Sequence, residues 1–149
     1  MRAALAIVFG LCLPSATSAA IQQKKTTPKR APKETSQVPA SLLRAVRSTV
    51  GEAARVKNVR SPRSSVVRII LDQPLVKEAD YRKALVGTCG EILKAKAERI
   101  ATTLEIVSAD ERQGYVYRPT SNCGEVIKAD DDRRRMIILP QTTVFRATR

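Results

Sequence analysis

The chain of 149 residues contains no histidine and no tryptophan, and aromatic residues make up only 3% of it. Histidine is the commonest general base and the commonest metal-binding side chain in proteins, so its absence removes the simplest routes to acid–base catalysis and to a metal centre. The chain also lacks a glycine-rich phosphate loop and a Gly-x-Ser-x-Gly nucleophile motif. We therefore predict that the protein is not an enzyme and uses no cofactor.

A run of three aspartates, Asp130–Asp132, is a candidate for calcium binding. It lacks the spaced ligands and the central glycine of a calcium-binding loop. Three basic residues, Arg133, Arg134 and Arg135, follow it directly. We therefore predict no metal site and expect the aspartates to lie just beyond a short helix, solvated or paired with these arginines. The same three arginines are candidate binding residues.

The N-terminus has the pattern of a secretory signal peptide. Arg2 supplies a positive charge, Ala3–Leu13 form an apolar run that Pro14 ends, and small residues lie at Thr17–Ala19. The apolar run is too short to span a bilayer. We predict that residues 1–19 are a signal peptide and that the mature protein is secreted or periplasmic, with no transmembrane span.

Residues 20–40 have the composition of a basic, disordered linker. The stretch combines five lysines and arginines and three prolines with a single acid, Glu34. Its few apolar residues cannot offset the conformational entropy lost on folding. Loss of Arg2 with the signal lowers the formal net charge from +13 to +12, so an anionic surface is the expected partner. A solvated spacer without a ligand is the alternative for the linker.

Signal removal leaves two cysteines, Cys89 and Cys123. Two thiols in an oxidising compartment usually pair, so we predict a disulfide between them. Such a bond would contribute on the order of 3 kcal/mol in the chain-entropy model. The alternative is a reactive thiol at a helix N-terminus, used by a redox protein or a thiol-dependent enzyme.

Both cysteines lie in similar elements, Thr88-Cys89-Gly90-Glu91 and Asn122-Cys123-Gly124-Glu125. The first has the spacing of a helix N-terminal capping box and the second is a close variant. Gly87 precedes the first element and is typical of a helix terminator. The pattern predicts that a helix breaks near Gly87 and a new one begins at Thr88.

Hydrophobic periodicity predicts one small α+β domain over residues 41–149. A helix begins at Ser41 and ends before Ser61-Pro62. Strands are expected at 66–71, 102–107, 114–118, 135–139 and 142–146, and helices at 77–100 and 122–129. Without the first helix and the last strand, the order is βαββαβ, which resembles the ferredoxin-like arrangement.

That arrangement conflicts with the predicted disulfide. Its two helices are antiparallel, which places Cys89 about 15 Å from the start of the second helix. A disulfide needs Cα atoms within about 7 Å of each other. The topology, the helix boundaries or the pairing must therefore differ from this prediction.

One face of the sheet is expected to be uncovered. Strand alternation turns Arg68, Glu105, Tyr115 and Tyr117 onto it if Val67, Leu104 and Val116 face the helices. The stretch Arg112–Tyr117 resembles the aromatic strand of RNA-recognition modules. An exported protein is not expected to meet RNA, however, and ordinary cross-strand packing is the alternative role for the tyrosines.

The function predicted from the sequence is therefore binding. We expect an exported, periplasmic, small basic protein whose partner is another protein or an anionic envelope component, with electrostatic contact to a membrane surface. Two alternatives stay open. One is thiol chemistry at Cys89 or Cys123. The other is charge-driven binding of nucleic acid or a cell-wall polymer.

Overall fold

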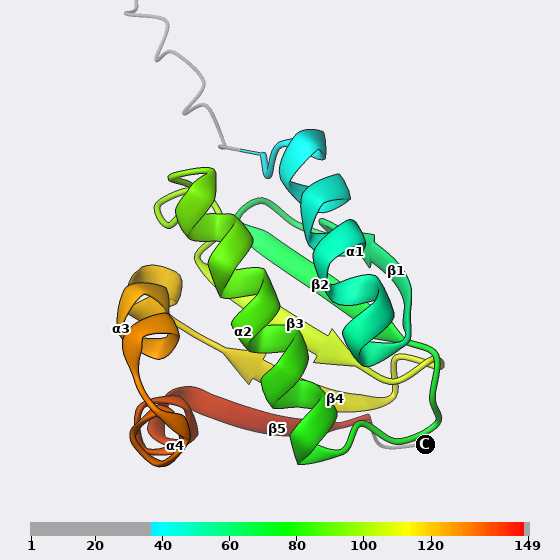
Figure 1. Cartoon of the computed structure of the whole chain (residues 1–149). Helices are drawn as coiled ribbons and strands as arrows, with labels where there is room; N and C mark the ends of the chain where they lie inside the picture. The colour runs from blue at the N-terminus through cyan, green and yellow to red at the C-terminus, as the bar shows by residue number, and fades with distance from the viewer. Residues whose placement is uncertain (1–36, 148–149) are drawn as a thin grey trace, which may run out of the picture. The chain divides into compact units, whose positions relative to one another are not determined.

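A computed structural model describes residues 37–147 as a small α+β domain, as the sequence predicts (Figure 1). The predicted signal peptide, and the linker up to residue 36, lie outside the described residues. The strands are β1 (Val56–Arg60), β2 (Val66–Leu71), β3 (Thr103–Val107), β4 (Gln113–Tyr117) and β5 (Thr142–Arg146). The helices are α1 (Ala40–Ala54), α2 (Glu78–Lys94), α3 (Cys123–Lys128) and α4 (Asp131–Ile138).

The five strands form one mixed sheet in chain order, β1-β2-β3-β4-β5. Strands β2 and β3 are parallel and joined through α2, and every other neighbouring pair is antiparallel. The ferredoxin-like arrangement is therefore wrong, because it would separate β2 from β3 by another strand. Two misassigned segments explain the error: 56–60, taken as helix, is the edge strand β1, and 135–139, taken as strand, belongs mainly to α4.

Helices α1 and α2 lie side by side over one face of the sheet (Figure 1). The apolar stripe of α1, Leu42, Val46, Val50 and Ala54, recurs every four residues and is buried. The helix ends earlier than predicted because Arg55 adopts a left-handed conformation with φ of 50°, and the chain turns there into β1. Packing of α1 and α2 onto the sheet thus forms the core.

Helix α2 is continuous through Gly87, so the predicted break is wrong. A Cβ at Gly87 would come within 2.9 Å of the Val50 side chain, which shows that the glycine allows close contact between α1 and α2. The Thr88 hydroxyl donates to the carbonyl of Ala84 at 2.7 Å instead of capping a new helix. Glu91 accepts from Thr49 and Lys94. Gly87 is therefore explained by the close packing of α1 against α2 and not by the end of a helix.

The predicted disulfide is confirmed: Cys89 and Cys123 are bonded, with their Cα atoms 5.0 Å apart. The bond joins the interior of α2 to the first residue of α3, and both cysteines are fully buried. Helix α3 has only six residues and lies beside α2, so its first turn reaches the middle of the longer helix. The topology, not the pairing, was the wrong part of the prediction. A disulfide is compatible with an extracellular location.

None of the helices within residues 37–147 is long and apolar enough to cross a membrane. Val38, which the sequence places in the linker, is buried against the core. The core therefore includes a residue that precedes the predicted boundary at residue 41.

Candidate binding surface on the open face of the sheet

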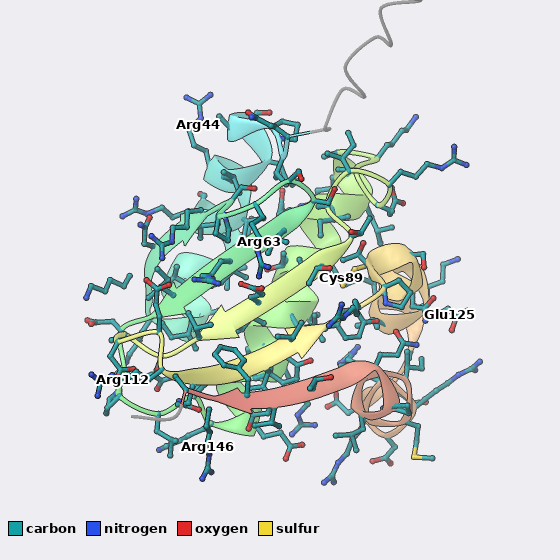
Figure 2. The ribbon with its side chains drawn as sticks, turned by 180° about the vertical axis from the view of Figure 1, so that it is seen from behind. Arg44, Arg63, Cys89, Arg112, Glu125 and Arg146 are labelled. Atoms are coloured by element: carbon teal, nitrogen blue, oxygen red, sulfur yellow. A yellow bond between two sulfur atoms is a disulfide. The ribbon has the colours of Figure 1, made fainter. Side chains whose placement is uncertain are left out.

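In the described part of the chain, the helices leave the second face of the sheet uncovered, and Figure 2 shows this open face with its side chains. Alternation along β2 and β3 buries Val67, Ile69, Leu104 and Ile106 beneath the helices. Arg68 and Glu105, which lie between these residues in the strands, consequently point to the open face. For both residues, the predicted orientation is confirmed.

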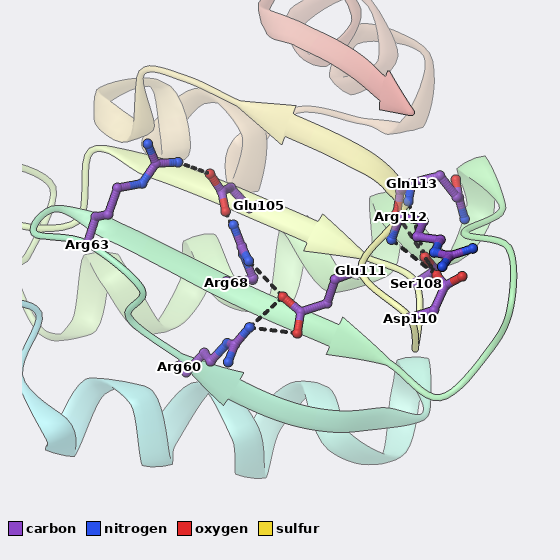
Figure 3. Close-up of polar contacts among 9 residues, drawn as sticks. All are labelled: Arg60, Arg63, Arg68, Glu105, Ser108, Asp110, Glu111, Arg112 and Gln113. Atoms are coloured by element: carbon purple, nitrogen blue, oxygen red, sulfur yellow. Dashed lines mark hydrogen bonds and ion pairs between the residues drawn. The ribbon is translucent and has the colours of Figure 1, made fainter. Parts of the chain in front are cut away.

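Five charged residues on this face form a continuous chain of ion pairs, which we call the charge ladder (Figure 3). In order, they are Arg63, Glu105, Arg68, Glu111 and Arg60. Arg63 lies 3.3 Å from Glu105, and Arg68 bridges the two glutamates with N–O distances of 2.7 Å to each. Arg60 completes the ladder at Glu111. The ladder thus connects β1, β2 and β3 with the turn after β3.

Arg68 is the centre of the ladder and not a free guanidinium. Its Nε donates to Glu105 and its Nη1 donates to Glu111. The Glu105 side chain is only 9% exposed, so its carboxylate needs these donors to offset desolvation. We infer that Arg68 mainly orients the two carboxylates, whereas Arg60 and Arg63 at the two ends of the charge ladder are more exposed.

Glu111 reaches the ladder from the turn between β3 and β4. This turn is held by Asp110, which accepts hydrogen bonds from the Ser108 hydroxyl and the Arg112 backbone N–H. These bonds lower the pKa of Asp110. Glu111 itself has a positive φ of 58°, a conformation that is uncommon for a residue with a Cβ. The turn therefore positions the Glu111 carboxylate over the sheet (Figure 3).

The Glu111 carboxylate makes the fold sensitive to acid. Burial alone would raise its pKa, but hydrogen bonds from Arg68 and Arg60 outweigh this effect and lower the pKa from its ordinary value of 4.5. A lowered folded-state pKa stabilises the fold above the unfolded-state pKa, and this stabilisation is lost as the pH falls through the folded-state pKa. We expect Glu111→Gln to reduce the free energy of unfolding by about 1 kcal/mol at pH 7 and to flatten its fall below pH ~4.5.

Denaturant unfolding at a series of pH values checks this result. Glu125→Gln is the matched control, because it removes the same charge from an exposed side chain outside the ladder. The control should retain the acid sensitivity of the wild type. An unchanged pH profile in Glu111→Gln would show that the ladder does not stabilise the fold.

The predicted outward orientation of Tyr115 and Tyr117 is wrong. Tyr115 stacks on Tyr81 of α2 with ring centroids 4.4 Å apart, and Tyr117 is fully buried. Burial raises the pKa of Tyr117 to about 12. The two tyrosines pair with Ile106 and Leu104 across β3, so they share the helix-covered face, and Val116 points the other way. Tyrosine supplies more apolar surface than valine, which explains why the aromatic side of β4 faces the core.

Arg133, Arg134 and Arg135 lie on α4 and do not join Arg68 on the open face. Arg134 donates to the carbonyls of Val126 and Ala129 and pairs with Asp131, so it caps the C-terminal end of α3. The Arg135 Nε atom lies 3.8 Å from the Glu78 Oε1 atom of α2.

The aspartate run begins α4. Asp130 accepts from the backbone N–H of Arg133 as the helix N-cap. The aspartates lie just beyond the short helix α3, as predicted, and they also start α4, which the sequence did not predict. The predicted pairing with arginine is confirmed at Asp131. Among the residues that the structure describes, no group of acids and cysteines could hold a metal ion.

Three further arginines, which the sequence analysis missed, flank the β4–β5 pair: Arg112 and Arg146 lie at one end of the pair and Arg118 lies at the other. We call these three residues the arginine rim. All three residues are exposed, and none takes part in an ion pair within residues 37–147. Figure 2 shows Arg112 and Arg146 projecting at the same end of the sheet.

A sequence signal for the arginine rim exists. The segments 112–118 and 139–147, which include β4 and β5, contain these three arginines and no aspartate or glutamate. The ladder carboxylates come from β3 and its turn instead. The β4–β5 half of the sheet is therefore positively charged, with Asp110 and Glu111 as neighbouring acids in the turn before Arg112.

A hollow of about 410 Å³ lies where α1, α2 and α4 meet. Its lining combines alanine and valine side chains with Arg82, Lys83 and Arg134. Asp131, the one acid in this lining, is bonded to Arg134. Among the lining residues that the structure describes, no carboxylate is therefore free to act as an acid or base.

Comparisons of the chain with protein-family models, with curated proteins and with solved structures found no match. The geometry of the domain is therefore the basis for any functional conclusion.

Proposed function

We propose that the protein is an exported binding protein that recognises an anionic ligand through the arginine rim, Arg112, Arg118 and Arg146. The observation that carries this proposal is the unequal distribution of charge over the sheet. On the β1–β3 half, Glu105 and Glu111 accept bonds from three arginines. On the β4–β5 half, the three arginines form no ion pair among the described residues, although Asp110 and Glu111 directly precede Arg112 in sequence.

Unpaired exposed arginines suit anion binding for a physical reason. A guanidinium presents several N–H donors in a fixed plane and stays charged at every physiological pH, so it binds carboxylates, sulfates and phosphates. An arginine already bonded to a glutamate must first lose that partner. The arginine rim carries no such penalty, whereas Arg68 in the ladder does.

Export is the other half of the proposal, and it rests on the signal-like N-terminus together with the disulfide. The thiol-dependent alternative gains no support from the geometry. Both cysteines are fully buried and bonded to each other, so neither sulfur is available as a nucleophile in this state. Binding by charge therefore explains the observed surface better than cysteine chemistry does.

The arginine rim should determine how tightly the protein is held by a polyanion. We expect the triple variant R112Q/R118Q/R146Q to elute from immobilised dextran sulfate at clearly lower salt than the wild type, because binding by several arginines is weakened by screening. Dextran sulfate is a suitable probe because it has charge but no peptide backbone. Salt-gradient elution provides the measurement.

The control variant is R44Q/K96Q/R99Q, which removes three positive charges at other exposed positions. Figure 2 shows Arg44 at the opposite end of the domain from Arg112 and Arg146. The control should elute close to the wild type. Equal shifts in both triple variants would mean that net charge alone governs binding, and the proposed site would then be rejected.

A further inference from the structure

Strand β5 is an edge of the sheet, and no strand within residues 37–147 pairs with its outer side. The Arg118 N–H donates to the Gln141 carbonyl, and the Ala147 N–H donates to the Arg112 carbonyl. Together with the register, these two bonds show which residues of β5 are hydrogen-bonded to β4. In an antiparallel pair, every second residue bonds to the partner strand, so Thr143 and Phe145 bond to β4. The N–H and C=O groups of the alternate residues, Val144 and Arg146, therefore point away from the sheet.

The other edge, β1, is protected against pairing. A bulge interrupts its register between Val56 and Asn58. The Asn58 side chain accepts from the Val59 backbone N–H at 2.9 Å, and Arg47 donates to the Lys57 carbonyl. Bulges, charged side chains and occupied backbone groups are the usual means of preventing edge-to-edge association. Strand β5 has no bulge in its register with β4, and Val144 is 57% exposed.

We propose that β5 binds an extended acidic polypeptide segment, which adds to the sheet as a sixth strand. This inference rests on the proposed function and gives the anionic ligand a chemical class. Val144 and Arg146 supply the backbone donors and acceptors, and Arg112 and Arg118 supply the charge on the open-face side. Binding through an exposed sheet edge is a recurring mode of peptide recognition, in which backbone bonds give affinity and side chains give specificity.

Charge complementarity indicates which kind of polypeptide binds at the β5 edge. Segments 112–118 and 139–147 carry three arginines and no acid, so an acidic segment is complementary to them. A second copy of this chain would instead bring a like-charged protein, with a net charge of +13, against the same edge. The side chains give a pattern as well: continued alternation places Arg112 and Arg118 on the open-face side, and exposed Val144 lies on the helix side together with Arg146.

A peptide that alternates glutamate with valine fits this pattern. Its valines would lie beside Val144 and its glutamates would lie on the side of Arg112 and Arg118. The probe is the blocked peptide Ac-EVEVEVE-NH2, titrated into the full-length protein. The control Ac-EPEPEPE-NH2 has the same charge but lacks the alternate N–H groups that a new strand needs.

Residue-specific amide exchange, followed by NMR, reports the new bonds directly. At saturating Ac-EVEVEVE-NH2 we expect the Val144 and Arg146 amides to exchange at least about tenfold more slowly, because they gain hydrogen-bond partners. The Thr143 and Phe145 amides already bond to β4 and should change little. The proline peptide should bind at least about tenfold more weakly, since backbone bonding supplies much of the affinity.

A variant tests the same point from the protein side. Val144→Pro removes an outward N–H without removing a bond to β4, a position where an edge strand tolerates proline. It should lose at least tenfold in affinity (about 1.4 kcal/mol) for the valine peptide and retain its salt elution from dextran sulfate. Val144→Thr keeps the N–H and should bind as the wild type does.

Three outcomes would overturn strand addition. In the first, both peptides bind equally without slowing exchange at Val144 and Arg146, so the contact is electrostatic only. In the second, neither peptide binds while the arginine rim still holds dextran sulfate. In the third, these amides are protected without peptide and the protein sediments as a dimer, so the edge belongs to a second copy. All three leave the proposed anion binding intact, which fails if the arginine-rim variant elutes from dextran sulfate unchanged or shifts no more than the control variant does.

Discussion

Replacing Gly114 by alanine is expected to destabilise the domain by about 3 kcal/mol, a large overpacking effect. Gly114 lies opposite Val107 in the antiparallel pair of β3 and β4. A Cβ at this position would overlap the carbonyl oxygen of Ile106 and come within 2.9 Å of the Val107 Cα. These are backbone atoms of the neighbouring strand, so no side-chain rotation relieves the overlap, and the two strands must separate.

Gly90→Ala is the matched control for this prediction. Gly90 lies inside α2, and a Cβ there would have open space around it. Alanine is more favourable than glycine in a helix interior by about 1 kcal/mol, so this variant should gain stability. Chemical denaturation of both variants against the wild type measures the difference. A Gly114→Ala protein as stable as the wild type would show that β3 and β4 are less closely packed than described.

The strands with strong apolar alternation could be predicted from the sequence. Alternating Val67, Ile69 and Leu71 in β2 correctly placed Arg68 on the open face. Strand β1 could not be recognised in the same way. Its sequence, VKNVR, is mostly polar, and Arg55 turns the chain directly from α1 into β1 with no glycine, proline or asparagine at that position.

Local pattern also failed where tertiary packing decides between similar alternatives. The run Met136–Leu139 has strand-like composition, but Asp130 caps a helix before it and only Ile138 is buried. In β4, the choice between the tyrosine face and the valine face depends on contact with Tyr81 of α2. A period of two residues identifies the two faces of a strand but not which one meets the core.

The candidate site was predictable only in part for a related reason. Arg68 and Glu105 follow from alternation, but Glu111 belongs to a turn whose left-handed residue brings it over the sheet. The bare edge at β5 depends on the strand order, which the sequence did not reveal. The arginine rim, in contrast, could have been found by noting that segments 112–118 and 139–147 lack acids.

Removing the disulfide is expected to produce the other large loss of stability. The bond closes a loop of 34 residues, and a crosslink of this span restricts the unfolded chain by about 3 to 4 kcal/mol. The double variant C89A/C123A should therefore unfold at markedly lower denaturant concentration than the oxidised wild type. The wild type in excess reductant should approach the variant, and an unchanged unfolding midpoint would contradict a stabilising role.

The same variant distinguishes a structural role of the two cysteines from a catalytic or redox role. Cys89 and Cys123 lie in α2 and α3, whereas the arginine rim lies at the ends of β4 and β5. Under conditions where the variant is folded, it should therefore elute from dextran sulfate as the wild type does. A redox protein or thiol enzyme would lose its activity with the sulfurs even where the fold survives. Retained binding with reduced stability is the result expected if the disulfide supports the sheet and the arginines act as the binding groups.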